Sequence, residues 1–255
     1  MKIATWNVNS LRVRLPQVFT WLDAERPDVL ALQETKVVDA DFPVQDFAGR
    51  GYAVSFSGQK TYNGVAVAST IPLSGVVTAI PGLDDPQKRV LYGRLGEVGI
   101  LNLYVPNGSE VDSEKYRYKL DWLHSLRDFI AGLVGRDGRL VVLGDFNIAP
   151  TDADVHDPDT WREKILCSTP EREAFAALVA LGLEDCFRRF PQPEQSYSWW
   201  DYRAAGFRRN LGLRIDHILA GTSLADACTA CRIDRGPRGW ERPSDHAPVV
   251  AVFAA

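Results

Sequence analysis

Carboxylate, amide and imidazole side chains recur at the ends of short apolar runs in this chain. The six runs cover residues 2–7, 28–34, 101–104, 140–147, 213–217 and 244–252. Runs of Val, Leu and Ile bounded by turn residues are typical of buried strands. A rigid sheet positions the loops at its strand ends, where chemistry is usually placed. The runs therefore predict one polar, metal-ready site built from Asn7, Glu34, Tyr104, Asp145, Asn147, Asp216, Asp245 and His246.

Asp145 and Asn147 follow an aliphatic run, and residues two apart in extended backbone point the same way. One would serve as an acceptor or base and the other as a neutral donor toward the same group. An isolated Asp-x-Asn is more often a turn that closes a strand. Alone, Glu34 and Asn7 would likewise be a solvated carboxylate and a turn cap. Together, their oxygen ligands suit Mg²⁺ or Mn²⁺.

The most specific motif is Asp245-His246, followed by Pro248 at the start of an aliphatic run. Packing alone does not favour this combination. A second Asp-His pair stands at Asp216 and His217. We expect His217 in the core and His246 as the catalytic imidazole. Asp216 would then fix the tautomer of His246 and favour its charged form.

Length and composition indicate one globular α/β domain. The chain has 255 residues, 45% hydrophobic and 24% charged, with a formal net charge of −4, and is long enough to bury a core. No apolar run approaches the ~20 residues of a membrane span, and no signal or transit segment precedes the first run. We therefore expect a single domain over residues 1–255 in a soluble, cytoplasmic, monomeric protein.

Arginine and cysteine give weaker signals. One arginine cluster contains Arg203, Arg208, Arg209 and Arg214, and a second contains Arg232, Arg235, Arg238 and Arg242. Clustering alone fits a solvated surface and a phosphate-binding face equally well. Cys228 and Cys231 form a lone Cys-x-x-Cys without further ligands at zinc spacing. Reduced structural thiols are the simpler interpretation.

Strand-like and helix-like segments alternate along the whole chain. Amphipathic spacing predicts helices over residues 16–24, with Pro16 in the first turn, over residues 116–134, ended by Gly135, and over residues 169–181, ended by Gly182. Further strands are expected over residues 52–56, 64–68 and 90–95. This alternation predicts α/β layers around packed sheets without an internal domain boundary.

The ordered motifs resemble those of the exonuclease III/AP endonuclease family. The matching segments, in family order, are Trp6-Asn7-Val-Asn9, Gln33-Glu34-Thr-Lys36, Gly144-Asp145-Phe-Asn147, Gly212-Leu-Arg-Ile-Asp216 and Ser244-Asp245-His246. Residues 58–66 and 197–203 match further segments. The resemblance implies a four-layer α/β sandwich of two packed mixed β-sheets flanked by helices. It also implies Mg²⁺-dependent hydrolysis of duplex DNA, with Mn²⁺ as a substitute: incision 5′ to abasic sites, 3′→5′ exonuclease action and removal of 3′ blocks.

The resemblance further implies roles for the polar residues. Glu34, Asn7 and Asp245 would hold the metal beside the scissile phosphate. Asp145 would orient and deprotonate the attacking water. The remaining donors are Asn147, His246 and the Tyr104 hydroxyl, which would contact phosphate oxygens. Each well-placed donor would stabilise the transition state by ~3 kcal/mol. Because Asp145, Asn147 and His246 are also able to ligate a second ion, one and two metals both remain open.

DNA contacts are expected mostly at phosphates, because a repair enzyme must tolerate any sequence. The expected contacts are Arg12, Lys36, Lys60, Asn63, Arg203 and Arg208. Trp199 and Leu213 match family positions that line the pocket for an abasic sugar, which flips out of the helix at little cost. One of Trp199 and Trp200 is expected in the core.

Two positions depart from the family pattern. Leu166 occupies a position where AP endonucleases usually carry a small residue, and a bulkier side chain would obstruct the flipped sugar. That would shift the balance from abasic incision toward trimming of 3′ ends. Asn9 replaces an acidic residue of some relatives, which would affect metal affinity at most.

Three alternatives remain open. The first is a specialised 3′-phosphatase or 3′-exonuclease with weak abasic incision, supported by Leu166 alone. The second is a metal phosphoesterase of the wider superfamily, acting on phosphoinositides, sphingomyelin or non-specific DNA, which residues 33–36 and 199–203 disfavour. The third is a non-catalytic DNA-binding module. Such a module would have lost some catalytic residue, yet all are present: Glu34, Asp145, Asn147, Asp216 and His246.

Overall fold

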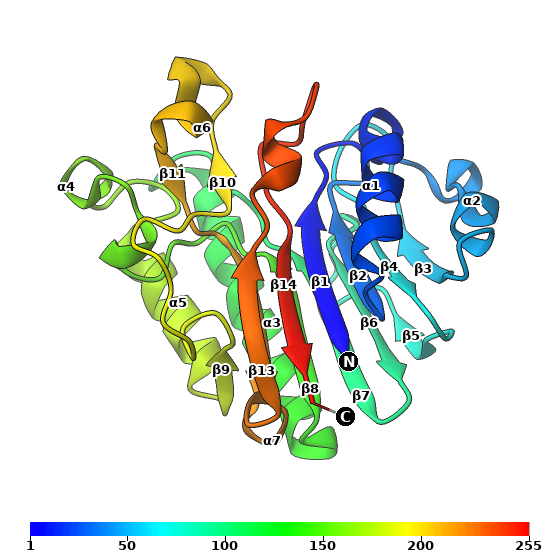
Figure 1. Ribbon diagram of the computed structural model, residues 1–255. Helices are drawn as coiled ribbons and strands as arrows, with labels where there is room; N and C mark the ends of the chain where they lie inside the picture. Colours follow the sequence, from blue (N-terminus) through cyan, green and yellow to red (C-terminus); the bar gives the residue numbers. More distant parts are fainter. Residues whose placement is uncertain (255) are drawn as a thin grey trace.

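Two six-stranded mixed sheets form the body of the protein (Figure 1). The computed structural model describes residues 1–254 apart from the side chains of residues 136 and 137. The first sheet contains, in spatial order, β13 (Cys228–Ile233), β14 (Val249–Phe253), β1 (Lys2–Asn7), β2 (Val29–Gln33), β4 (Val65–Ser69) and β3 (Ala53–Ser57). The second contains β5 (Ser74–Val77), β6 (Val90–Leu95), β7 (Val98–Tyr104), β8 (Leu140–Asp145), β12 (Asp216–Gly221) and β9 (Leu183–Asp185).

Helices cover the outer face of each sheet, as Figure 1 shows. The first sheet is covered by α1 (Leu11–Glu25) and α2 (Val44–Ala48), and the second by α3 (Glu114–Asp137) and α5 (Thr169–Val179). The remaining elements are α4 (Pro158–Trp161), α6 (Gly206–Arg209), α7 (Thr222–Ala225), the short pair β10 (Trp199–Trp200) and β11 (Gly212–Leu213), and the 3₁₀ turns Asp39–Asp41, Asp152–Asp154, Arg203–Ala205 and Gly236–Gly239. The predicted four-layer α/β sandwich is confirmed.

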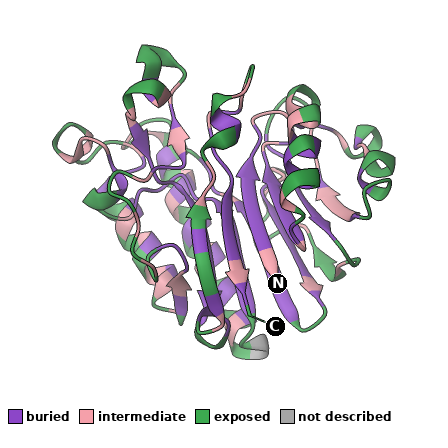
Figure 2. Cartoon of the chain, in the orientation of Figure 1, coloured by how far each residue is buried: buried purple, intermediate pink, exposed green. Residues whose placement is uncertain are grey.

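Alternation along the strands explains why they form continuous apolar runs. Ile3 and Ala31 face the core between the two sheets, whereas Ala4 and Leu30 pack against α1 and its neighbours. Successive side chains of a strand point to opposite faces, and both faces are covered here. Figure 2 shows the result, with buried central strands and exposed outer helix surfaces. No helix of the described residues is long and apolar enough to cross a membrane.

Most predicted strands match the observed ones to within a few residues, but the run over residues 244–252 forms a strand only from Val249 onward, as β14. The strands β1 and β6 have the predicted bounds for residues 2–7 and 90–95. The run over residues 213–217, predicted as one strand, is divided between β11 and β12. At the division, the hydroxyl of Ser198 accepts the backbone N–H groups of Ile215 (3.1 Å) and Asp216 (3.0 Å) in place of a neighbouring strand.

Two helix ends differ from the prediction. The helix α1 begins at Leu11, so Pro16 lies inside it rather than in its first turn. Its start is held by backbone bonds from Ser10 and Leu11 to the loop after β2, at 2.8 and 2.9 Å. The helix α3 continues past Gly135 and ends where Gly138 takes the left-handed conformation at φ 57°. A glycine within a helix weakens it without ending it. The helix α5 ends near its predicted end.

A buried polar link joins the two sheets at their centre. Asn102 on β7 donates to the carbonyls of Leu32 on β2 (3.0 Å) and Ala66 on β4 (2.9 Å). It also accepts from the side chain of Gln33 at 2.7 Å. Gln33 is the last residue of β2 and directly precedes Glu34. The link therefore fixes the relative position of strands whose ends carry the predicted site.

Candidate active site

The predicted polar residues meet at one end of the sandwich, opposite the end where both chain termini lie (Figure 1). The parallel strands β1 and β2 end together, with Asn7 opposite Gln33. The parallel strands β7 and β8 likewise place Tyr104 opposite Asp145. The strand β12 runs the other way and begins with Asp216 paired to Asp145. The ends of four strands and the start of a fifth therefore deliver polar side chains to one place.

A glycine allows Asp145 to sit where it does. Gly144 adopts φ 144°, and a Cβ atom there would lie 1.9 Å from the carbonyl oxygen of Leu103. Only glycine lets β8 approach β7 this closely immediately before the carboxylate.

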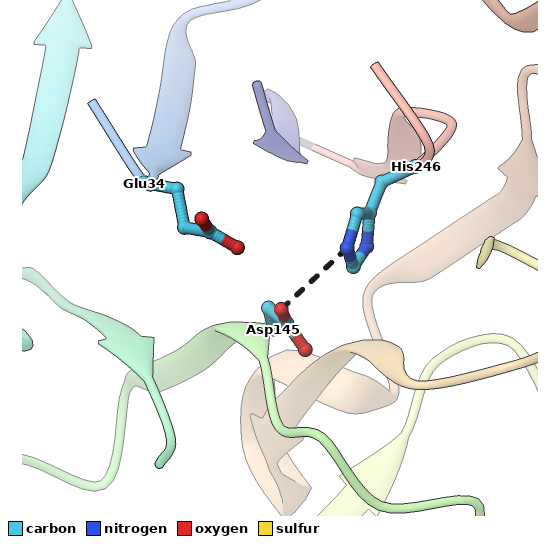
Figure 3. A group of neighbouring side chains, drawn as sticks. All are labelled: Glu34, Asp145 and His246. Atoms are coloured by element: carbon cyan, nitrogen blue, oxygen red, sulfur yellow. Dashed lines mark ion pairs between the residues drawn. The ribbon is translucent and has the colours of Figure 1, made fainter. Parts of the chain in front are cut away.

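Three side chains form a group that is able to hold a metal ion. Ligand atoms of Glu34, Asp145 and His246 all lie within 4.8 Å of one another. Figure 3 shows these side chains turned toward a common point from the ends of β2 and β8 and from the loop before β14. The amide of Asn7 donates to Glu34 Oε1 (2.9 Å) and to Asp145 Oδ2 (2.8 Å). One amide therefore holds both carboxylates in place.

His246 is held in its charged form. Its Nδ1 lies 2.9 Å from Asp216 Oδ2, and its Nε2 lies 3.7 Å from Asp145 Oδ2 (dashed in Figure 3). Burial opposes a charged imidazole, but the carboxylates of Asp216 and Asp145 outweigh it and raise the pKa of His246 to about 10. Burial raises the pKa of Asp145 to about 7, although the charge of His246 opposes this shift. The expected bond between His246 and Asp216 is confirmed.

The second Asp-His pair gives the expected core histidine. His217 is fully buried, and its Nε2 lies 2.9 Å from the carbonyl of Ile148. Burial, aided by the charge of Arg214, lowers the pKa of His217 to about 4. This imidazole is therefore neutral at physiological pH, in contrast to His246.

Asn147 is fixed by its neighbours on every side. Its backbone takes the left-handed conformation at φ 49°, and its N–H donates to Asp145 Oδ1 at 2.9 Å. Its side-chain oxygen accepts from Asn107 (3.0 Å), and its side-chain nitrogen donates to the Val105 carbonyl (3.0 Å). A weaker contact of 3.4 Å joins that nitrogen to Asp145. The amide therefore turns its nitrogen toward the carboxylate side of the site.

Tyr104 stays protonated beside the acidic group. Burial raises the pKa of Tyr104 well above its usual value, and the charges of Glu34 and Asp145 add to this effect. The guanidinium carbon of Arg89 lies 4.7 Å from the centre of the tyrosine ring. The hydroxyl therefore acts as a hydrogen-bond donor, here toward Glu34. A pocket of about 360 Å³ opens beside it, lined also by Asn63 and Asn107.

Asp245 stands outside the three-residue group. Its Oδ1 accepts from Asn9 (3.0 Å) and its Oδ2 from the indole of Trp199 (3.0 Å). Burial works against ionisation, but the charge of His246 and these two hydrogen bonds lower the pKa of Asp245. Lys36 lies 2.8 Å from Glu34 Oε2, so its ammonium belongs to the site rather than to the open surface.

The other predicted DNA contacts differ in exposure. Arg12, Lys60, Arg203 and Arg208 are exposed, with Arg12 in an ion pair to Asp41 at 3.2 Å. Asn63 is buried, and its amide donates to Gln59 and Gln87, both at 3.1 Å. Arg214 does not belong to a surface cluster, because it is buried against Asp154 (2.6 Å) and Asp185 (2.7 Å). It therefore serves packing rather than phosphate contact.

An apolar corner borders the site. Leu213 and Leu166 are buried in one cluster with Trp199 packed against it. Leu166 is 4% exposed and adopts φ 72°, and its carbonyl accepts from Ala149 N at 2.8 Å. Trp200 is fully buried whereas Trp199 is half-buried, which confirms that one of the two belongs to the core.

Sequence reasoning missed two residues that touch the site, Asn107 and Lys119. Asn107 donates to the side-chain oxygen of Asn147, and Lys119 donates to the backbone carbonyl of Asn147 at 2.7 Å. Asn107 follows a strand in a Pro-Asn-Gly turn, which is a weak signal. Lys119 gave a clearer one, because it stands in the apolar stripe of its helix between Tyr116 and Leu123. Lysine is rarely buried without a partner.

Comparisons with known proteins agree with this arrangement. A family model described as the endonuclease/exonuclease/phosphatase family matches residues 4–246. Exodeoxyribonuclease III of Haemophilus influenzae is 36% identical over 266 residues, covering 99% of this chain and 100% of the relative. A 3′ phosphatase from Neisseria, solved with a product DNA hairpin, is 48% identical with a TM-score of 0.98 and full coverage of both chains. An AP endonuclease from Archaeoglobus fulgidus is 42% identical with a TM-score of 0.96, again with full coverage of both. The chain therefore belongs to the endonuclease/exonuclease/phosphatase family and, within it, to the exonuclease III/AP endonuclease group of nucleases.

Proposed function

We propose that this protein is a Mg²⁺-dependent DNA-repair nuclease that hydrolyses the phosphodiester 5′ to abasic sites in duplex DNA. It would also act as a 3′→5′ exonuclease and a 3′-phosphatase. The observation that carries this proposal is the group of Glu34, Asp145 and His246, with ligand atoms within 4.8 Å. Phosphate-ester hydrolysis needs a cation site, a base for water and donors for phosphate oxygens. The residues at this end of the sandwich would supply all of them.

The donor set fits a divalent cation that prefers oxygen. Glu34 offers a carboxylate. Asn7 would offer its amide oxygen, which here accepts from the backbone N–H of Asn9 at 2.9 Å, once its amide group turns over. Oxygen ligands of this kind suit Mg²⁺ and also Mn²⁺. Asp245 is the third proposed ligand of this ion. Asp145, Asn147 and a neutral His246 would be the ligands of a second ion, as the alternative to their roles in proton transfer and phosphate contact. When bound, the cation supplies charge neutralisation and Lewis acidity at the scissile phosphate. The close approach of Glu34 and Asp145, bridged by Asn7, gives a site where a positive charge is favoured.

The chain's own residues supply the proton transfer and the contacts to phosphate. We assign Asp145 as the base that orients and deprotonates water, since its pKa of about 7 suits a base at neutral pH. His246, as a cation, would face the phosphate oxygens together with Asn147 and Tyr104. Each well-placed donor lowers the barrier by ~3 kcal/mol. Asp216 supports this by keeping His246 charged.

Duplex DNA with abasic sites or blocked 3′ ends is the proposed partner of a monomeric enzyme. Exposed Arg12, Lys60, Arg203 and Arg208 would contact phosphates, which carry no sequence information. Lys36 and Asn63, nearer the acidic group, would contact the strand that is cut. The Neisseria relative solved with a DNA hairpin supports this choice of partner.

A second candidate function rests on Leu166. Its side chain fills the apolar corner beside Leu213 and Trp199, where a flipped abasic sugar would lie. A filled corner favours substrates without a flipped sugar, such as a nick that ends in a 3′-phosphate. The 48% identical Neisseria relative is a 3′ phosphatase. This candidate is a 3′-end processing enzyme with weak abasic incision.

Two duplexes test both candidates. One carries a single abasic-site analogue and the other a nick that ends in 3′-phosphate, each incubated with Mg²⁺ and with chelator. Metal-dependent cutting of the first supports the abasic endonuclease, whereas dephosphorylation of the second alone supports the 3′-end processor. The variants Glu34→Ala and Asp145→Ala should lose activity on whichever duplex reacts. Undiminished turnover by either variant would refute the assigned site.

A further inference from the structure

Lys119 on α3 is a fully buried lysine behind the active site. Its ammonium donates to the carbonyl of Asn147 at 2.7 Å and to that of Asn107 at 3.2 Å. It also forms an ion pair with the fully buried Glu171 on α5. Lysine and glutamate are rarely buried completely unless they are paired. This arrangement therefore places a cation where it meets three acceptors from three separate segments.

These three segments converge at the ammonium group. Asn107 lies in the loop after β7, Asn147 in the loop after β8, and Glu171 in the first turn of α5. The other oxygen of Glu171 accepts the backbone N–H and the hydroxyl of Ser168, at 3.1 and 2.7 Å, in a capping box. Lys119 therefore ties the start of α5 to both loops.

The ammonium acts on a residue whose backbone conformation is unusual. Asn147 adopts φ 49°, a left-handed conformation that needs support from its surroundings. Lys119 holds the carbonyl of Asn147, and Asn107 donates to its side-chain oxygen at 3.0 Å. Because Lys119 holds the carbonyl of Asn107 as well, it supports the Asn147 amide along two routes. An ammonium has three donors that spread in different directions, as three separate acceptors require.

We infer that Lys119 is a positioning residue for the hydrolytic reaction and acts through Asn147. It holds the amide of Asn147 at the place where the phosphate oxygens gain charge in the transition state. This inference rests on the proposed function, because the contact between Asn147 and phosphate belongs to that proposal. Loss of such a contact lowers kcat rather than substrate affinity.

Two variants of the full-length protein separate positioning from stability. Glu171→Gln removes the counter-charge of the buried ammonium, which then loses a proton, but the neutral amine keeps two N–H donors for the two carbonyls, so this variant is the matched control. Lys119→Met combined with Glu171→Gln removes the ammonium without leaving an unpaired buried carboxylate. On the nicked 3′-phosphate duplex with Mg²⁺, we expect kcat within about threefold of wild type for the control and about thirtyfold lower for the double variant, with KM within about threefold for both.

A second background shows which residue Lys119 acts through. In an Asn147→Ala protein, the same two substitutions at Lys119 and Glu171 should lower kcat by less than about threefold further, because their target is already gone. Losses that multiply in this background would overturn the inference. So would a folded double variant whose kcat equals that of Glu171→Gln.

A substitute variant and an NMR measurement test the role of Lys119 if the double variant does not fold or the protein shows no activity. If the double variant does not fold, Lys119→Arg is the substitute, because it keeps the ion pair but replaces the ammonium by a planar guanidinium. We expect the kcat of this variant to be about tenfold lower than that of wild type. A kcat equal to that of wild type would overturn the inference. The side-chain amide NMR signal of Asn147, recorded without metal, should move in the double variant and stay in place in Glu171→Gln. An unmoved signal also overturns the inference. Wild-type protein inactive on both duplexes refutes the proposed function, while the NMR signal still tests Lys119.

Discussion

His246 keeps a positive charge at a buried position because two carboxylates face its two ring nitrogens. Asp216 lies 2.9 Å from Nδ1 and Asp145 lies 3.7 Å from Nε2. The nearer carboxylate fixes the ring orientation and leaves Nε2 as the donor toward the site. The same sequence contains a neutral histidine in His217, so the identity of the neighbours, not burial alone, sets the charge.

Asp216→Asn should therefore change the pH dependence of catalysis. In the wild type the pKa of His246 is raised to about 10, so the imidazolium persists until pH rises through that value. Without the Asp216 charge the pKa falls and the imidazolium is lost at lower pH. We expect kcat of the variant to fall about tenfold relative to wild type near pH 9 and to differ less near pH 6, in a pH–rate profile.

The exposed Asp152→Asn serves as the control, and parallel profiles for Asp216→Asn and wild type would contradict this account.

The free energy of unfolding should depend on pH in the same direction as kcat does. A raised histidine pKa contributes stability that is fully present below about pH 6.5, the unfolded value, and is lost as pH rises through about 10. Asp216→Asn removes that contribution.

Leu166→Gly should open the apolar corner. Glycine suits the φ of 72° better than leucine does, and removal of the side chain leaves space beside Leu213 and Trp199. We expect the ratio of abasic incision to 3′-phosphate removal to rise about tenfold, measured on the two duplexes. Leu178→Ala, a buried control away from this corner, should lower stability by about 2–5 kcal/mol and leave the ratio unchanged. An unchanged ratio for Leu166→Gly would show that this side chain does not exclude the sugar.

At the scale of elements, the strands were predictable because both their faces are buried. Such strands form continuous apolar runs that end at turn residues, and the residues at those ends include Asn7, Tyr104 and Asp145. The order of the motifs along the chain then indicated the whole sandwich. The site residues were predictable for the same reason, since they are fixed by strand ends rather than by long loops.

Features that depend on distant partners were not predictable from local pattern. Arg214 looked like part of a surface cluster, but its partner Asp154 is 60 residues away in the sequence. Lys119 pairs with Glu171, which lies 52 residues further along. The helix boundary at Leu11 likewise depends on bonds to the loop after β2, and Pro16 gave a misleading local signal. Local sequence preference predicts that a helix forms, while tertiary contacts decide at which residue it begins or ends.

The inter-sheet link at Asn102 yields a prediction at this scale. Asn102→Leu leaves the Leu32 and Ala66 carbonyls without their donor, and buried unsatisfied groups cost about 1–3 kcal/mol each. Because Glu34 follows β2 and Asp145 ends β8, slippage between the sheets should also weaken metal binding. We expect lower stability in urea unfolding and about tenfold weaker Mg²⁺ activation.

A matched substitution on the same strand isolates the link. Leu103→Ala makes a cavity on the opposite face of β7 and should lower stability by about 2–5 kcal/mol without changing Mg²⁺ activation. Equal Mg²⁺ dependence in Asn102→Leu and Leu103→Ala would show that the link serves stability alone.

At the scale of the whole molecule, one core joins both sheets and the site lies across their shared end. Glu34 follows β2 of the first sheet, Asp145 ends β8 of the second, and His246 precedes β14 of the first. A cation held by Glu34 and Asp145, beside His246, therefore binds the two sheets to each other. Metal binding and the stability of the complete fold should be coupled.

We accordingly expect one cooperative thermal transition that Mg²⁺ shifts upward. A ligand at ten times its Kd stabilises the native state by about 1.4 kcal/mol, which corresponds to roughly 3–5 °C in Tm for a chain of this size. Chelator should return Tm to the metal-free value. Glu34→Gln, which removes one carboxylate charge beside Asp145, should abolish the shift. Differential scanning calorimetry measures both quantities. Two separate transitions, or a Mg²⁺ shift retained by Glu34→Gln, would show that the sheets unfold independently or that the ion binds elsewhere.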